Sequence, residues 1–182
     1  MWRYLSEEGG VYKVNDIVIY GKMGACKVAD ITVPKHLNVA SHRLYYVLKP
    51  FNENCTIYAP VNTPVFMRPV ISAEEADRLI DKIPALPHEA IDEESTKDLV
   101  RHYESALESH DCEDLIKLTM AIHAKKRDAE GKGRKLGQID QRFMKQAEAI
   151  LFGEFALAFG IPQEQVPSYI ASRVAGRDRK LA

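Results

Sequence analysis

The hydrophobic pattern of this 182-residue chain changes its period once, at Ser72. Before Ser72, short runs of β-branched and aromatic residues are separated by glycine, proline and asparagine, a pattern typical of strands and turns. From Ser72 onward, apolar residues recur every three or four positions, as they do on one face of a helix. We therefore predict an α+β protein in which a β-rich half precedes a helical half.

The β-rich half contains five candidate strands and no candidate helix between them. They are expected at residues 11–20 (two short runs hinged at Asn15–Asp16), 25–33, 43–49, 55–59 and 65–68. Strands this short and this closely spaced predict a small, strongly curved antiparallel barrel. We expect such a barrel to bind another macromolecule through an edge strand or a loop, and to lack a deep catalytic pocket.

The helical half begins with a capping box, Ser72-Ala-Glu-Glu75, and its first helix should end at Pro84. Four further helices are expected to start near Ser95, Asp111, Asp140 and Gln163 and to form a compact bundle. The predicted organisation is an extension or leader at 1–10, a β-domain at 11–70, a helix and linker at 71–92, a helical domain at 93–175, and a charged, frayed tail at 176–182.

The near-neutral net charge of −1 hides a strong segregation of charge along the helical half. Residues 125–145 contain eight basic and three acidic residues, whereas residues 88–114 contain ten acidic and two basic ones. A concentrated basic segment is a candidate surface for a polyanion. A structural alternative exists for Lys125, Lys126 and Arg127, because we expect them in the last turn of a helix, where cations stabilise the helix dipole.

No motif for catalysis, metal binding or cofactor binding is found. The glycine-rich segment 131–135 follows a predicted helix rather than a strand, so it is a poor phosphate-binding loop. His36 and His42 are expected to be solvated loop residues. Cys26, Cys55 and Cys112 lack ligand spacing, and we expect all three to be small buried residues of a protein from a reducing cytoplasm. No apolar run is long enough to span a membrane, and we predict a protein without enzymatic activity.

Two segments resemble a known family. The run Tyr12-Lys-Val-Asn-Asp-Ile-Val-Ile-Tyr20, with Gly24-Ala-Cys-Lys-Val28 after it, resembles the RNA polymerase-interacting domain of the CarD family, a module that also occurs in the transcription-repair coupling factor. The run Ala147-Glu-Ala-Ile-Leu-Phe-Gly-Glu-Phe-Ala-Leu-Ala158 is similar to the CarD C-terminal domain. The resemblance implies a bacterial transcription regulator with a Tudor-like barrel and a helical DNA-contacting domain.

The resemblance also implies where the two halves bind. The barrel would add its edge strand to a sheet of the RNA polymerase β subunit, through Thr56, Ile57, Tyr58, Ala59 and Pro60. The helical domain would contact phosphates and the minor groove of promoter DNA at the upstream edge of the bubble and stabilise the open complex. Its candidate DNA-contacting residues are Leu99, Arg101, Lys125, Lys126, Arg127, Lys132, Arg134, Lys135, Arg142 and Lys145.

Two positions depart from the family pattern. Leu99 stands where several members carry a tryptophan that wedges into the minor groove, so Leu99 is either a weaker wedge or a core residue. Tyr58 stands where better-known members have an arginine in the docking strand.

Three alternatives stay open at this point. The protein could be an adaptor that docks on polymerase without touching DNA, which the acidic segment and the absence of the family tryptophan favour. We expect a monomer, although an exposed edge strand would also allow a strand-exchanged dimer. Glu154 lies in an apolar run and is either a buried, partnered acid or, as we expect, an edge residue in water.

Overall fold

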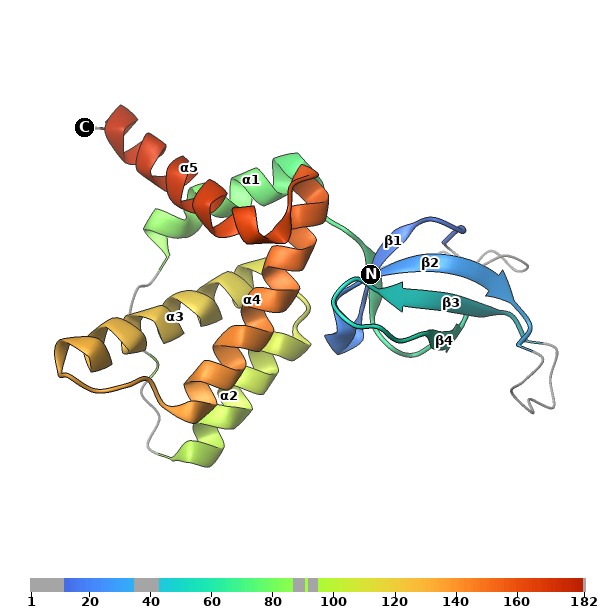
Figure 1. The fold of residues 1–182 in the computed structure, drawn as a ribbon, viewed down its shortest axis with the longest axis horizontal. Helices are drawn as coiled ribbons and strands as arrows, with labels where there is room; N and C mark the ends of the chain where they lie inside the picture. The colour runs from blue at the N-terminus through green and yellow to red at the C-terminus, as the bar shows by residue number, and fades with distance from the viewer. Residues whose placement is uncertain (1–11, 35–42, 87–90, 92–94, 182) are drawn as a thin grey trace. The chain divides into compact units, whose positions relative to one another are not determined.

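The computed structural model describes residues 12–34, 43–86, 91 and 95–181, with side chains as far as residue 176. The chain divides into two compact units, Met1–Val70 and Ile71–Ala182, and Figure 1 shows strands in the first and helices in the second. The prediction of an α+β chain with strands before helices is confirmed. The predicted extension at 1–10, His36 and His42, and residues 87–90 and 92–94 of the predicted linker lie outside the described residues.

The described residues of the first unit form one antiparallel sheet of five strands. The strands are β1 (Ile17–Tyr20), β2 (Ala25–Thr32), β3 (Tyr45–Pro50), β4 (Ile57–Pro60) and β5 (Met67–Pro69), in the spatial order β4-β3-β2-β1-β5. The register between β2 and β3 shifts between Val28 and Asp30, and an irregularity of this kind increases the local twist of a sheet. Closure of the sheet into a barrel stays a prediction.

The core of the sheet is small and is covered by Tyr12. The core residues Val18, Cys26, Val28, Tyr46, Leu48 and Ala59 are buried. The backbone N–H of Tyr12 donates to the hydroxyl of Tyr46 at 3.2 Å, and the Tyr12 hydroxyl donates to the carbonyl of Met67 at 3.2 Å. Tyr12 therefore links β3 to β5 over the core. Burial, followed by the neighbouring Tyr46, raises the pKa of Tyr12.

The first predicted strand is shorter than expected. Asn15 has a left-handed backbone conformation, with φ of 77°, and Asp16 accepts from the backbone N–H of Lys13 at 2.7 Å. These two features form a turn, so the regular strand begins only at Ile17. The hinge at Asn15–Asp16 is where the sequence placed it, but the run before it is not a strand.

The described residues of the second unit form five α-helices. They are α1 (Ala73–Lys82), α2 (Thr96–Glu108), α3 (Cys112–Gly131), α4 (Gln138–Phe159) and α5 (Val166–Leu181). The side chains of Ser72, Ser95 and Asp111 each accept a backbone N–H of the first turn that follows, as N-caps do. These three predicted helix starts are therefore confirmed.

Two helices extend beyond their predicted ends. Helix α3 continues through Gly131 and is closed by a turn in which Gly133 has φ of 67° and Arg134 donates to the carbonyl of Ala129. Lys125, Lys126 and Arg127 thus lie before the last turn, and the helix-dipole explanation of their charge is wrong. Helix α5 continues through Leu181; fraying of the charged tail stays a prediction.

The carboxylate of Glu154 is completely buried, with an exposed fraction of 0%, so the expected edge position in water is wrong. Its Oε1 accepts from the backbone N–H of Ile71 at 3.1 Å, and its Oε2 accepts from the thiol of Cys112 at 3.2 Å. Ile71 precedes α1, and Cys112 is the first residue of α3. Glu154 therefore joins the starts of two helices to the C-terminal part of α4.

The cysteines differ in their surroundings. Cys26 and Cys112 are buried, as expected, whereas Cys55 is exposed, so the prediction for Cys55 is wrong. Burial raises the pKa of the Cys26 thiol to about 12, which leaves that thiol protonated and unreactive near neutral pH. Cys55 lies in the turn that precedes β4, where a small apolar side chain has no core to enter.

Helix α1 packs within the helical unit, where a network of charged side chains joins it to α5. The guanidinium of Arg173 donates two hydrogen bonds to Asp81, at 2.8 and 3.0 Å, and lies 3.0 Å from Asp77. The hydroxyl of Tyr169 donates to Asp77 at 2.9 Å. Burial and the hydrogen bond to Asp77 raise the pKa of Tyr169.

Replacing Arg173 with methionine should destabilise the helical unit by about 1–2 kcal/mol, since a bidentate charged pair is lost and two aspartates one turn apart are left to repel each other. The midpoint of urea denaturation, followed by circular dichroism, measures this loss. Lys82→Met is the matched control: it breaks the more exposed pair between Lys82 and Glu113, at 2.9 Å, and should change the midpoint much less. Equal shifts in the two variants would contradict a special role for Arg173.

Candidate macromolecular interfaces

Among the described strands of the first unit, β4 lies at one end of the sheet and pairs with β3. The N–H of Val61 donates to the carbonyl of Leu44 at 3.1 Å, and the ladder pairs Tyr46 with Ala59 and Leu48 with Ile57. Hydrogen-bonded pairs alternate along an antiparallel ladder. The intervening position of β4, Tyr58, therefore directs its backbone toward the edge that faces away from β3.

The predicted docking residues occupy this strand and the position before it. Ala59 is buried in the core, Ile57 packs against the core, and Tyr58 and Pro60 are half-buried. Thr56 is exposed immediately before the strand. Pro60 has no N–H to donate, so it limits how far a further strand could pair along this edge.

Exposed apolar side chains lie near both ends of β4, and they are not among the residues predicted for docking. Phe51, in the β3–β4 connection, is 50% exposed, and Leu44, which pairs with Val61 beyond the end of β4, is 44% exposed. The sequence did contain a signal for these exposed side chains: they are bulky apolar residues in connections, where such side chains are rarely buried. They extend the surface that a partner at β4 could cover.

In the helical unit, α3, the loop at 132–137 and the start of α4 form a helical hairpin (Figure 1). Residues 125–145 of this element are called the basic hairpin here. It brings together eight of the ten predicted DNA-contacting residues: Lys125, Lys126, Arg127, Lys132, Arg134, Lys135, Arg142 and Lys145. The other two, Leu99 and Arg101, lie on α2.

Three of the predicted cations form ion pairs within the unit. Lys132 pairs with Asp128 at 2.9 Å, and Arg101 pairs with Asp98 at 2.9 Å. Both of these pairs are exposed, so each should contribute little to stability and open easily. Lys125 pairs with Asp140 at 2.9 Å, and this pair is much less exposed, at 23% and 10% for the two side chains.

The Lys125–Asp140 pair belongs to a cluster that also contains Tyr103. The Tyr103 hydroxyl donates to Asp140 Oδ1 at 2.7 Å, and Lys125 Nζ donates to the same oxygen at 2.9 Å. Burial, reinforced by the hydrogen bond to Asp140, raises the pKa of Tyr103 far above its ordinary value. The cluster ties α2, α3 and α4 together through one carboxylate oxygen. The count of charged residues could not reveal this cluster, because in the sequence Asp140 is an isolated acid among cations.

Most of the other cations of the basic hairpin are directed to solvent. Arg127, Arg134, Lys135, Arg142 and Lys145 are exposed, and Lys126 is half-buried. The guanidinium of Arg142 lies 4.7 Å from the ring centre of Phe143, which restrains it without neutralising it. Such a set of cations can contact phosphates without reading bases.

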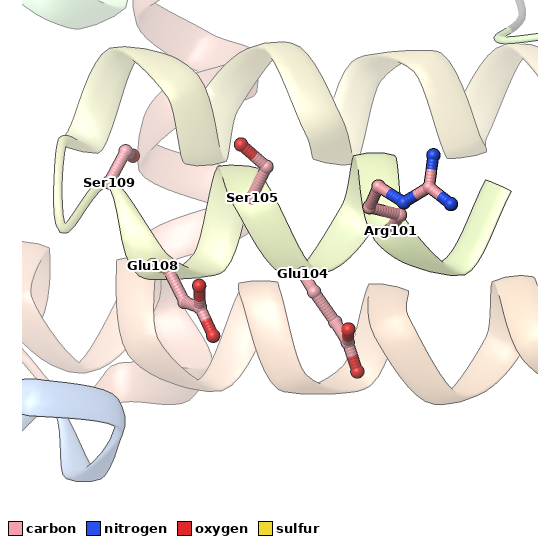
Figure 2. A pocket seen from close by; sticks show the side chains of 5 residues that line it. All are labelled: Arg101, Glu104, Ser105, Glu108 and Ser109. Atoms are coloured by element: carbon pink, nitrogen blue, oxygen red, sulfur yellow. The ribbon is translucent and has the colours of Figure 1, made fainter. Parts of the chain in front are cut away.

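Helix α2 presents a different surface. Figure 2 shows Arg101, Glu104, Ser105 and Glu108 on α2 and Ser109 directly after it, where together they line a shallow, open hollow. Glu104 and Glu108 are exposed carboxylates one turn apart, so this face is acidic beyond Arg101. Leu99 is half-buried and packs against the helical core. A role for Leu99 as a minor-groove wedge stays a prediction.

Comparison with protein families bears on the first unit. Residues 12–71 match the model of the CarD-like/TRCF RID domain. The first unit is a CarD-like/TRCF RID domain. The RID is an RNA polymerase-interacting module and not a catalytic one, so the protein is an RNA polymerase-interacting, transcription-related protein. The match covers about a third of the chain and leaves the helical unit outside it. No curated protein matches the chain.

None of the described residues form a group of three or more His, Cys, Asp or Glu side chains that could hold a metal ion. None of the described helices combines the length and the apolarity needed to cross a bilayer.

Proposed function

We propose that the protein is a bacterial transcription regulator that binds the RNA polymerase β subunit through the RID and promoter DNA through the helical unit. The observation that carries this proposal is the position of β4 at the end of the RID sheet, with Tyr58 turned to its outer edge. A strand at the end of a sheet can pair with a strand of a partner. Thr56, Ile57, Tyr58, Ala59 and Pro60 are the proposed docking segment.

The DNA-contacting surface is proposed to be the basic hairpin. Its solvent-directed cations would contact phosphates near the upstream edge of the transcription bubble, where affinity would depend strongly on salt. Leu99 and Arg101 on α2 would lie at the margin of this surface. Contacts of this kind position a protein on DNA and carry little sequence specificity.

The two interfaces would act together. Docking on polymerase raises the effective concentration of the helical unit at the promoter, so modest affinity for DNA is sufficient. A protein held on both polymerase and the upstream edge of the bubble would slow the collapse of the open complex. We therefore expect it to change initiation rates rather than catalyse a reaction.

The experiment that tests this function has two measurements. The first is co-purification of the full chain with bacterial RNA polymerase and with an isolated β subunit. The second is the lifetime of open complexes after a competitor is added, with and without the protein. Binding to the β subunit together with a longer lifetime supports the proposal, whereas binding to polymerase without any change in lifetime would contradict its DNA-contacting part.

The adaptor function is the second candidate, and the acidic face of α2 with the paired Arg101 favours it. Replacing Lys126, Arg134 and Lys135 with glutamine separates the two candidates. For a DNA-contacting protein, the slope of log affinity against log salt should fall by about 0.9 for each phosphate that is no longer neutralised, or about 2.7 for three phosphates. Fluorescence anisotropy with a promoter duplex measures this slope.

The matched control for this variant replaces Lys13, Lys27 and Lys49, three exposed cations of the RID, with glutamine. Both variants lose three positive charges, but the control should keep the slope of the unmodified chain. An adaptor would show the same weak DNA binding in both variants and would retain its transcriptional effect in both.

A further inference from the structure

Lys125 is grouped by its place in the sequence with the DNA-contacting cations, but its surroundings set it apart from them. Its ammonium group is held inside the helical unit by Asp140, at 2.9 Å, and its side chain is 23% exposed. The other ion-paired lysine of the basic hairpin, Lys132, has a side chain that is 63% exposed and a partner, Asp128, that is 71% exposed. The two lysines therefore differ in burial, although both pair with an aspartate: Lys125 is largely buried and Lys132 is exposed.

The partner of Lys125 is itself fixed in place. Asp140 lies in the first turn of α4, where a negative charge is stabilised by the helix N-terminus. The hydroxyl of Tyr103 donates to it at 2.7 Å, and a Cβ at Gly137 would lie 3.0 Å from its Oδ2. The ring of Tyr103 in turn packs edge-on against Phe143, with ring centres 5.2 Å apart. Little room is left for Asp140 to change its position.

This geometry matters because the solvent-directed cations lie on both sides of the cluster. Lys126 and Arg127 follow Lys125 on α3, while Arg142 and Lys145 follow Asp140 on α4. The bond between Lys125 and Asp140 joins the two helices at the level of these residues. A phosphate backbone has fixed spacing, so cations from two helices can contact it together only if the helices are held in register.

We propose that Lys125 is a positioning residue rather than a DNA contact: with Asp140 and Tyr103 it holds the two helices of the basic hairpin so that their exposed cations meet the phosphate backbone together. This inference rests on the proposed DNA-contacting function. It assigns contact to Lys126, Arg127, Lys132, Arg134, Lys135, Arg142 and Lys145, and it removes Lys125 from that set.

The test is the sign of the change in DNA affinity when Asp140 is replaced with asparagine in the full chain. If Lys125 were a phosphate contact restrained by Asp140, Asp140→Asn would free it and strengthen binding. The positioning role predicts the opposite, a loss of about tenfold, because the cations of the two helices lose their register. Anisotropy with a promoter duplex at several salt concentrations gives both the affinity and the salt slope.

Asp128→Asn is the matched control, because it makes the same change of charge in the same hairpin and frees the exposed Lys132. It should leave binding unchanged or strengthen it up to a few fold. A second variant, Tyr103→Phe, keeps the ring packing and all charges and removes one hydroxyl from the cluster. Like Asp140→Asn, it should weaken DNA binding. It also provides the test if the asparagine variant does not fold.

The outcomes distinguish the positioning role from the DNA-contacting function on which it rests. Weaker binding by Asp140→Asn and by Tyr103→Phe, with unweakened binding by Asp128→Asn, supports the positioning role. Stronger binding by Asp140→Asn, or unchanged binding by a folded Tyr103→Phe, overturns it while the DNA-contacting function stands. An unmodified chain whose binding shows no salt dependence overturns the DNA-contacting function and the positioning role with it.

Discussion

Replacing Tyr58 with proline is expected to reduce the affinity of the full chain for RNA polymerase by about ten- to a hundredfold. Tyr58 directs its backbone to the outer edge of β4, so proline there removes a donor from a strand-to-strand ladder and leaves the pairing with β3 in place. Loss of one such hydrogen bond in a desolvated interface costs about 1–3 kcal/mol, which corresponds to this change in affinity. Biolayer interferometry with immobilised β subunit measures it.

Tyr58→Val is the matched control for the proline variant. It removes the same aromatic side chain but keeps the N–H and the strand conformation, for which valine is well suited. If docking depends on the main chain, the valine variant should bind within a few fold of the unmodified chain. Equal losses in the two variants would show that the phenol ring, and not strand addition, makes the contact. Circular dichroism of both variants verifies that the RID is folded.

Replacing Glu154 with alanine should destabilise the helical unit by about 3 kcal/mol or more. The backbone N–H of Ile71, which is partly buried, would lose its acceptor, and this loss costs about 1–3 kcal/mol. The deleted side chain would also leave a cavity between α4 and the starts of α1 and α3, and that loss adds to the first. Urea denaturation followed at 222 nm gives the free energy of unfolding.

Glu154→Gln separates the hydrogen bonds from the carboxylate charge. Glutamine has nearly the same shape and keeps one oxygen to accept from Ile71, so most of the stability should be retained. If the free energy of unfolding of the alanine variant lies within about 1 kcal/mol of that of the unmodified chain, the contact with Ile71 does not stabilise the unit. If glutamine is as damaging as alanine, one acceptor oxygen is not sufficient and the site also requires the second oxygen, which accepts from Cys112.

The order of the elements could be predicted from local sequence because each carries its own signal. Ser72, Ser95 and Asp111 are N-caps that the structure retains, and the change of period at Ser72 falls beside the division between the two units. The errors lie where local signals compete with longer-range ones. The glycine-rich segment 131–135 was expected to follow the helix, yet Gly131 is the last residue of α3, because the chain turns only where Gly133 takes a left-handed conformation.

The interior polar residues could not be predicted, because their partners are distant in the chain. Glu154 bonds Ile71 and Cys112, which precede it by 83 and 42 positions, and Asp140 bonds Tyr103, which precedes it by 37. The spacing of apolar residues along the sequence does not indicate which distant residues pair. A carboxylate in an apolar run is compatible with either an exposed or a buried position until its partners are located.

The interface residues fall into two groups. The docking strand could be placed from the resemblance, and β4 does lie at the end of the RID sheet, although its use as a docking strand is a proposal. The basic segment was correctly read as dense in cations, but its charge count treats Lys125 and Lys132 alike. Only the burial of Asp140 distinguishes a lysine held in the interior from one paired at the surface.

Hydrogen–deuterium exchange of the full chain, with and without RNA polymerase, is the decisive test of docking through β4. Peptides that cover residues 56–61 should gain protection on binding, because the outer edge of β4 would pair with a strand of the β subunit. Peptides that cover β5, at the other end of the sheet, should change little. Unchanged exchange at 56–61 in a saturated complex, or protection at β5 instead, would contradict docking through β4.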